Sequence, residues 1–298
     1  MLDHKLTIFY HAAKNLNTTK AAEILRISQP AVSKSIKELE REMGLTLFER
    51  EKGRLALTPA GKYLLEQSED LIERERTITF NLQHMKEEFS GTLHIGASTT
   101  LSQYILPELL AQFRERYPQI KINLISGNTD QIEQELLNRN IQLAFIEGTP
   151  SQPDIHYIPF LKDEIVLVTS SKNTAHDSIT KEQLKKLKFV VREKGSGTYN
   201  IIQRHLSDAG IADKELDQQM VIGSTEGIKQ YLKYSDCYAL VSIFSIRDQL
   251  ACGMLKIVDM DDLEITRTLY AIHKQGQIDS YAELLLRFCE ARKKMIQK

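Results

Sequence analysis

Residues 17–61 read NTTKAAEILRISQPAVSKSIKELEREMGLTLFEREKGRLALTPAG, and this stretch decides how the N-terminal part of the chain folds. Apolar residues recur there at helical spacing in two short segments, which a connection at Arg26 and Ile27 separates. Ser28 is expected to cap the second helix, because its side-chain oxygen can accept a hydrogen bond from the first turn. Gly44 is expected to end that helix. The stretch therefore predicts a helix-turn-helix.

The apolar residues predict which faces of these helices are buried. Thr18 or Thr19 is expected to cap the first helix, which then carries an apolar stripe of Ala21, Ala22, Ile24 and Leu25. In the second helix the spacing i, i+4, i+7 and i+11 predicts one buried face, formed by Val32, Ile36, Leu39 and Met43. An earlier amphipathic helix is expected to complete a three-helix core with Ile8, Phe9, Ala12 and Ala13. Leu47 and Phe48 are expected to pack inward after it.

This burial leaves a polar face at the start of the second helix, where a helix-turn-helix meets the major groove of DNA. Gln suits adenine edges, whereas Ser and Lys can contact base edges or phosphates. Cations on a hairpin around Gly53 would lie beside phosphates, as the wing of a winged helix-turn-helix. The candidate DNA-binding residues are Thr18, Ser28, Gln29, Pro30, Ser33, Lys34, Lys37, Arg50 and Arg54, with Lys52 on the same hairpin.

Charge supports this interpretation only moderately. Residues 1–62 hold 11 Lys and Arg against 7 Asp and Glu, a net charge of +4, while the whole chain has a net charge of −1. A capped amphipathic helix pair with a polar face is also common in proteins that never bind nucleic acid. The alternative is therefore a small-molecule sensor whose N-terminal helices contact another protein.

The composition of the chain, with 298 residues, 42% hydrophobic and 27% charged, is ordinary for a soluble protein of two or three domains. The first residues lack the apolar core of a signal peptide, so a cytoplasmic location is expected. The three cysteines, Cys237, Cys252 and Cys289, have no metal-ligand or redox spacing. They are expected to be small buried or partly buried residues.

A long helix is expected from Thr58-Pro59 up to Ser90-Gly91, because no Gly or Pro interrupts the sequence after Gly61. Its apolar residues follow alternating steps of three and four, once Ser68 and Glu75 are included, along a seam of Leu64, Leu71, Ile78, Leu82, Met85 and Phe89. This pattern favours packing of helix on helix. A helix that lies on its own domain is the alternative.

From Gly91 onward, short strands alternate with helices, which predicts parallel α/β sheets. Ligands bind such sheets beyond the carboxyl ends of the strands. Small polar residues recur at those ends and could bind an anion through hydroxyl and free N–H groups. The candidate effector-binding residues are Ser98, Thr99, Thr100, Gln103, Glu147, Ser196, Thr198, Ser224 and Thr225. Each Ser or Thr, taken singly, could instead be only a helix cap.

The run AAEILRISQPAVSKSIKELEREMGLTLFER, followed by LTPAG, closely resembles the N-terminal domain of LysR-type transcriptional regulators. Residues 91–298 resemble the effector-binding domain of the same family, with landmarks such as Leu106-Pro107, Tyr117-Pro118 and Gly195-Ser196-Gly197-Thr198. The segments GASTTLSQYILP, SGNTDQI and FIEGT resemble most the branch that includes regulators of sulfite and sulfur assimilation.

The resemblance implies an N-terminal all-α winged helix-turn-helix with a long linker helix, and a C-terminal α/β effector domain of two subdomains, similar to periplasmic binding proteins. The expected limits are residues 1–58 for the DNA-binding domain, 59–90 for the linker and dimerisation helix, and 91–298 for the effector domain. Subdomain I would take about 91–161 and 268–298, and subdomain II about 162–267. The chain would cross between them near 161–163 and 265–268.

The resemblance also implies partners: promoter DNA, a second copy of the chain in a homodimer or homotetramer, and RNA polymerase. No cofactor, membrane or metal is expected, and the effector would be an inorganic anion or a small carboxylate. No GxSxG, Walker A or HExxH motif is present, and the eight histidines include no i, i+4 pair. We therefore expect no enzymatic activity.

Overall fold

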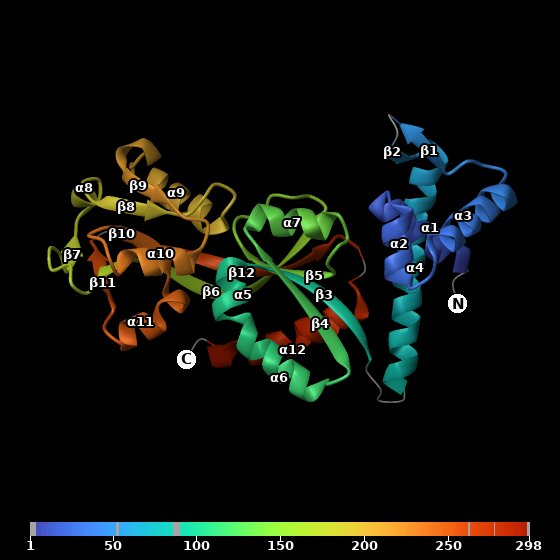
Figure 1. The fold of residues 1–298 in the computed structure, drawn as a ribbon. Helices are drawn as coiled ribbons and strands as arrows, with labels where there is room; N and C mark the ends of the chain where they lie inside the picture. Colours follow the sequence, from blue (N-terminus) through green and yellow to red (C-terminus); the bar gives the residue numbers. More distant parts are fainter. Residues whose placement is uncertain (1–3, 52–53, 86–89, 262, 277, 297–298) are drawn as a thin grey trace. The chain divides into compact units, whose positions relative to one another are not determined.

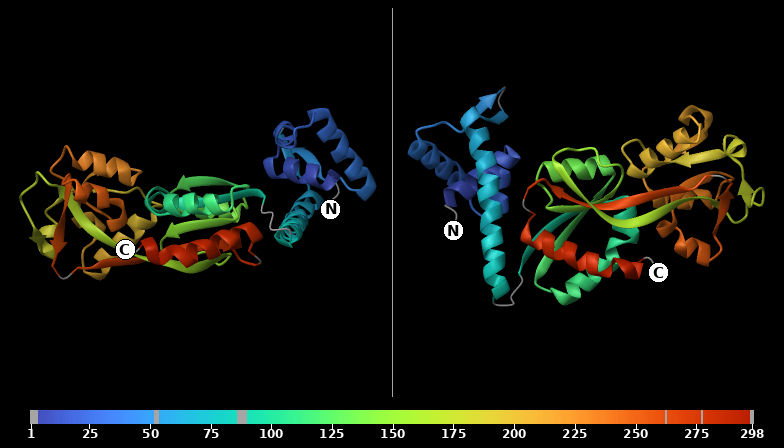
Figure 2. Two further views of the ribbon diagram at one scale, coloured as in Figure 1. Left: turned by 90° about the horizontal axis from the view of Figure 1, so that it is seen from below. Right: turned by 180° about the vertical axis from the view of Figure 1, so that it is seen from behind.

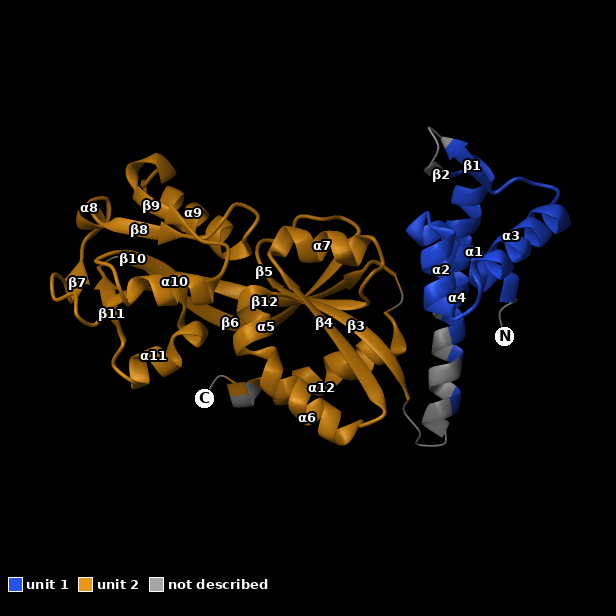
Figure 3. Ribbon diagram, viewed as in Figure 1, with its two compact units in different colours: residues 1–88 blue, residues 89–298 orange. Residues whose placement is uncertain are grey.

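The computed structural model describes residues 4–51, 54–85, 90–261, 263–276 and 278–296. The chain divides into two compact units, Met1–Glu88 and Phe89–Lys298 (Figure 3). In the helices of the described residues, no segment is long and apolar enough to cross a membrane.

The first unit is a helix-turn-helix with a wing and a long helix (Figure 1, blue to teal). Its elements are α1 His4–Asn15, α2 Thr18–Leu25, α3 Gln29–Met43, β1 Phe48–Glu51, β2 Arg54–Leu57 and α4 Pro59–Met85. β1 and β2 pair antiparallel, from Phe48 with Leu57 to Glu51 with Arg54. This arrangement confirms the predicted winged helix-turn-helix.

The caps of the two short helices follow the sequence, with one correction. Ser28 caps α3 and Gly44 ends it in the left-handed conformation at φ 67°, as predicted. The cap of α2 is neither Thr18 nor Thr19, because both threonines lie inside the helix. Asn17 takes that place with an extended backbone, and its Oδ1 accepts hydrogen bonds from the backbone N–H groups of the second and third helical residues.

The core of the first unit includes the four predicted α1 residues, and Leu47, Val32, Ile36 and Leu39 are buried as expected. Two predicted core residues are exposed instead: Ile24 by 48% and Met43 by 43%. Ile24 is turned roughly 100° around α2 from the adjacent Leu25, which packs on the core. Met43 is the last residue of α3, directly before the left-handed Gly44 that ends the helix.

The second unit is an α/β structure with a continuous path of paired strands. Its N-terminal elements are β3 Gly91–Ser98, α5 Thr99–Tyr104, α6 Leu106–Arg116, β4 Ile120–Gly127, α7 Thr129–Leu137, β5 Leu143–Glu147 and β6 Ile155–Ser170. The middle part contains β7 Ser178–Ile179, α8 Lys181–Leu184, β8 Lys188–Val191, α9 Gly197–Asp208, η1 Asp213–Glu215, β9 Asp217–Val221 and α10 Thr225–Leu232. The last part contains β10 Tyr238–Ser242, η2 Ile243–Ser245, α11 Arg247–Ala251, β11 Leu255–Met260, β12 Ile265–Lys274 and α12 Ser280–Ile296.

The strand order is β4-β3-β5-β12-β6-β10-β8-β9, and β11 pairs with both β6 and β7. The predicted parallel pairing is correct for β3 with β4 and β5, and for β8 with β9 and β10. It is wrong for β12, which pairs antiparallel with β5 and β6, and for the pairs that β6 makes with β10 and β11. The predicted fold class, an α/β domain of two subdomains, is confirmed.

Two long strands connect the subdomains. β6 and β12 run side by side as an antiparallel pair, from Ile155 with Lys274 to Ile165 with Ile265 (Figure 2). Separate core clusters lie at the two ends of this pair: one includes Ile132 and Ile272, and the other includes Leu167 and Phe189. The chain thus passes between subdomains inside regular strands, not in loops.

Two of the three cysteines, Cys237 and Cys289, are buried as predicted. Cys252 is exposed, which corrects the prediction, because it ends the short helix α11 at a surface turn.

Candidate nucleic-acid interface and ligand crevice

The face of α3 opposite the core is polar and open. Gln29, Lys34 and Lys37 are exposed, and Ser33 is half-buried beside them. The helix begins at Gln29 because the Ser28 side chain accepts a hydrogen bond from the backbone N–H of Ala31 at 3.4 Å. The Ser28 cap therefore fixes where α3 begins, and with it the direction in which the side chains of the first turn point.

Three candidate DNA-binding side chains are linked by hydrogen bonds. The Nε2 of Gln29 donates to the Oγ1 of Thr18 at 3.2 Å and to the Oγ of Ser33 at 2.9 Å. These contacts join the start of α2 to the first turn of α3. They hold the Gln29 amide in one orientation and use both of its N–H donors, so pairing with a base edge would have to replace one of these two hydrogen bonds.

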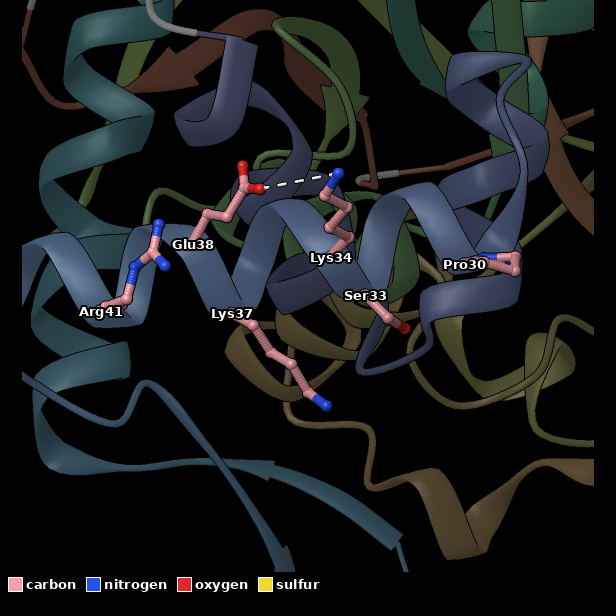
Figure 4. A pocket seen from close by; sticks show the side chains of 6 residues that line it. All are labelled: Pro30, Ser33, Lys34, Lys37, Glu38 and Arg41. Carbon is pink, nitrogen blue, oxygen red and sulfur yellow. Dashed lines mark ion pairs between the residues drawn. The ribbon is translucent and has the colours of Figure 1, made fainter.

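A shallow groove runs along the same face. It is lined by Pro30, Ser33, Lys34, Lys37, Glu38 and Arg41 (Figure 4). Lys34 and Glu38 form an ion pair at 4.0 Å, but the Lys34 side chain is 80% exposed. Such a pair contributes little to stability, so the ammonium group of Lys34 is available to a phosphate.

The wing contributes one described cation. Arg50 is exposed on β1, as predicted. Lys52 and the side chain of Arg54 lie outside the described residues. The position of the wing is fixed by Glu40, whose Oε1 accepts hydrogen bonds from the backbone N–H groups of Leu47 and Phe48 at 2.7 and 3.2 Å.

The long helix α4 carries apolar side chains that the first unit does not cover. Leu71, Ile78 and Leu82 are 46%, 56% and 51% exposed. Within the predicted seam Ser68 is buried, and its hydroxyl donates to the backbone oxygen of Leu64. The side chain of Met85 and all of Phe89 lie outside the described residues. An uncovered stripe at this spacing fits helix-on-helix pairing better than a helix packed on its own domain.

In the second unit, four of the candidate effector residues meet at one buried point. The carboxylate of Glu147, at the end of β5, accepts hydrogen bonds from the hydroxyls of Ser98, Thr100 and Thr198. The distances to Thr100 and Thr198 are 3.3 and 3.0 Å. Because Thr198 lies on α9, this cluster joins the two subdomains.

Arg267 on β12 completes the cluster. Its Nη1 donates to the Oγ1 of Thr198 at 2.8 Å and lies 3.8 Å from the Oε1 of Glu147. Its Nε donates to the Oδ2 of Asp163 at 2.7 Å, and the Oδ1 of Asp163 accepts from Ser242 at 2.9 Å. All these side chains are buried.

Arg192, buried directly after β8, makes a second contact between the subdomains. Its Nη1 donates to the Oγ1 of Thr99 at 3.0 Å and of Thr225 at 3.3 Å, and its Nε and Nη2 contact the carboxylate of Glu193 at 2.8 and 2.9 Å. Although burial opposes ionisation, the hydrogen bond and charge of Arg192 lower the pKa of Glu193.

A third contact between subdomains lies along α5 and α10. The hydroxyl of Tyr104 donates to Glu226 at 2.6 Å, and the buried Lys229 pairs with the same carboxylate at 2.6 Å. The Lys229 ammonium also lies 4.6 Å from the centre of the Tyr104 ring. Burial opposes ionisation of Glu226, but the hydrogen bonds from Lys229 and Tyr104 lower its pKa. Burial, followed by this contact with Glu226, raises the pKa of Tyr104.

The structure does not bring every candidate effector residue into this cluster. Gln103 is exposed on α5. Ser196 and Ser224 accept hydrogen bonds from the first turns of α9 and α10, so they act as helix caps. Ser98 does both, because it caps α5 and also donates to Glu147.

Sequence reasoning missed the two buried arginines. Arg192 directly follows a strand that pairs in parallel. Because ligands bind beyond the carboxyl ends of such strands, Arg192 could have been predicted as a site residue together with the hydroxyls. Arg267 falls on the buried side of an alternating strand pattern, between Ile265 and Leu269, and a cation at such a position usually has a partner. Site residues were expected only at the ends of parallel strands, and β12 pairs antiparallel with β5 and β6, so Arg267 was not among them.

Comparison with known proteins supports both units. Residues 4–62 match the family described as bacterial regulatory helix-turn-helix protein, lysR family, and residues 86–294 match the LysR substrate binding domain. The uncharacterized HTH-type transcriptional regulator YeiE of Escherichia coli (strain K12) is 31% identical over 292 residues, which cover 96% of each chain.

Solved structures show the same architecture. A full-length OxyR variant from Pseudomonas aeruginosa aligns with a TM-score of 0.75 and 20% identity over 99% of this chain and 95% of its own. The CcmR regulatory domain of Synechocystis PCC6803, in complex with 2-PG, aligns with a TM-score of 0.63 and 27% identity over 69% of this chain and 98% of its own.

Proposed function

The chain belongs to the LysR family of bacterial transcriptional regulators, and we propose that it reads operator DNA through α3 and responds to a small anionic effector in the crevice of the second unit. Membership makes the chain a DNA-binding transcriptional regulator with an effector-binding domain. We further propose which residues contact DNA, which residues contact the effector, and what chemistry the effector has.

The observation that carries the DNA-binding proposal is the open polar face at the start of α3. Gln29 and Ser33 would contact base edges, while Lys34, Lys37 and Arg50 would contact phosphates. Thr18, Ser28 and Pro30 would position this first turn, and Arg54 would extend the wing. The proposed limits are residues 1–58 for this domain and 59–90 for the linker helix.

Selection of genomic DNA fragments by the purified chain at near-physiological salt tests this proposal. We expect a motif of two half-sites, because two copies paired through α4 would present two recognition helices. Gln29→Ala should relax the base preference at one position by about 1–3 kcal/mol, while Gln67→Ala, on the exposed side of α4, should not. Binding that depends on salt but not on sequence would contradict the proposal.

The effector proposal is supported by two buried arginines among hydroxyl groups. Arg192 and Arg267 supply positive charge, and Ser98, Thr100 and Thr198 supply donors, which together suit an inorganic anion or a small carboxylate. The CcmR domain, solved with 2-PG, shows that a relative binds a small molecule. On the resemblance of its crevice segments, we assign the chain to sulfur metabolism, with sulfite as the first effector to test.

Subdomain closure would connect the effector to DNA. Thr99, Thr100 and Glu147 lie in the proposed subdomain I, whereas Thr198 and Thr225 lie in subdomain II. An anion that contacts both subdomains would bind the closed arrangement more tightly than an open one, and this difference in affinity would shift the equilibrium toward closure. The resulting change in how copies pack would alter the spacing of paired recognition helices. RNA polymerase is the further partner proposed for the DNA-bound regulator.

A further inference from the structure

The carboxylate of Glu147 already occupies the hydroxyl cluster that an anionic effector would use. Three of the hydroxyls proposed for the effector, those of Ser98, Thr100 and Thr198, donate to it. A glutamate carboxylate has the same two acceptor oxygens as a small carboxylate ligand. Glu147 is 1% exposed, so its carboxylate depends on these buried donors and not on bulk solvent.

The charges around Glu147 oppose a second anion. Its buried neighbours are the guanidinium of Arg267 and, on the other side of that arginine, the carboxylate of Asp163. Two carboxylates thus face the guanidinium of Arg267, while the other arginine of the proposed site, Arg192, is already paired with the carboxylate of Glu193. An anion added beside Glu147 meets net negative charge in a buried environment, where charges interact more strongly than in water.

Arg267 nevertheless has an unused donor. Its Nη2 is buried and makes no hydrogen bond within the described part of the chain. The other two guanidinium nitrogens are paired with Asp163 and Thr198. A buried N–H without an acceptor is unfavourable, so an acceptor oxygen reaching Nη2 would be stabilised.

We propose that Glu147 is a built-in competitor of the anionic effector. The effector displaces the Glu147 carboxylate, takes over the hydroxyls of Ser98 and Thr100, and pairs with Nη2 of Arg267. This inference rests on the proposed function, because it requires an anionic effector in this crevice. Glu147 then sets the concentration at which the regulator responds: the internal carboxylate weakens anion binding without blocking it.

Titration calorimetry on the full chain tests the proposal, with sulfite, sulfate, phosphate and acetate as probes. Glu147→Gln keeps an acceptor oxygen and nearly the same shape but removes the negative charge. We expect this variant to bind the preferred probe at least 10-fold more tightly than the wild type. Glu133→Gln is the matched control, because Glu133 is also buried but pairs with Tyr157 outside the cluster. Its affinity should equal that of the wild type.

Unchanged or weaker binding by a folded Glu147→Gln variant would overturn the proposal and make Glu147 a structural acceptor or a direct ligand. Glu147→Ala, which removes the competitor altogether, must show the same tightening and serves if the Gln variant does not fold. If the wild type binds a probe but neither variant binds it more tightly, only this inference fails. If no chain binds any probe, the proposed function fails for these four anions, and this inference fails with it.

Discussion

Gly197 is the position where a single methyl group should separate the two subdomains. It is the first residue of α9, directly after the Ser196 cap, and a Cβ built there would lie 2.1 Å from the backbone oxygen of Glu147. Real Cβ contacts essentially never fall below 3.0 Å, so the two backbones must move apart by roughly 1 Å. Alanine is otherwise well suited to a helix, so the obstacle to this substitution is the backbone oxygen of Glu147 on the other subdomain.

Overpacking of this kind costs about 1–3 kcal/mol. In the proposed mechanism the effector stabilises this close arrangement of the subdomains, so the cost would oppose effector binding and weaken it by about 5- to 150-fold. Titration calorimetry with the anion that the wild type binds most tightly measures this loss. Operator binding without effector should persist, because Gly197 is not part of the first unit.

Gly223→Ala is the matched control. Gly223 precedes α10, and a Cβ built on it meets no atom within 4 Å. It should bind the anion like the wild type. If Gly197→Ala also binds with wild-type affinity, the close approach of α9 to Glu147 is not needed in the bound state, and the closure argument is refuted.

Three further changes test other parts of the molecule. Arg50→Ala should weaken binding to all DNA duplexes alike and reduce the slope of log affinity against log salt by about one unit. The control Arg74→Ala, at an exposed position on α4, should change neither quantity. A loss of affinity for one sequence alone would mean that Arg50 reads bases. Ile78→Asp should weaken self-association more than about 10-fold in sedimentation, because burying each Ile contributes about 1.5–3 kcal/mol, and an unchanged dimer constant would exclude the α4 stripe as an interface. The pKa of Glu226 lies below its usual 4.5, so its contacts stabilise the fold above pH 4.5 and are lost as pH falls through the lowered pKa. Urea unfolding of Glu226→Gln should therefore show a smaller decrease in stability on acidification than the wild type, and identical pH profiles would contradict this role.

The sequence predicted the N-terminal unit well, because its information is local. The Ser28 cap, the Gly44 end and the buried residues of α1 depend on neighbours within one or two turns. Asn17 was missed because three consecutive residues there can each cap a helix, and only the backbone conformation selects one.

The polar cluster around Glu147 was predicted less completely, because its contacts join distant segments. The sequence located the hydroxyls at strand ends but gave no sign that Ser98 and Thr198 would meet at Glu147, since they lie 49 and 51 residues from it. The guanidinium of Arg267 arrives from still farther, on a strand whose antiparallel partner could not be inferred from alternation. Such juxtapositions depend on sheet order, which the pattern of single elements does not encode.

The paired strands β6 and β12 have a consequence for the ancestry and engineering of the domain. The chain leaves subdomain I on one strand and returns on its neighbour, so that Leu161 pairs with Leu269 and Ile165 with Ile265. Subdomain II is therefore a single uninterrupted insert whose two ends are adjacent in space. Recombination at these two points would exchange Arg192, Thr198 and Thr225 together while leaving Ser98, Thr100 and Glu147 in place. For the proposed effector site, ligand preference would thus be inherited in two separable halves, one from each subdomain.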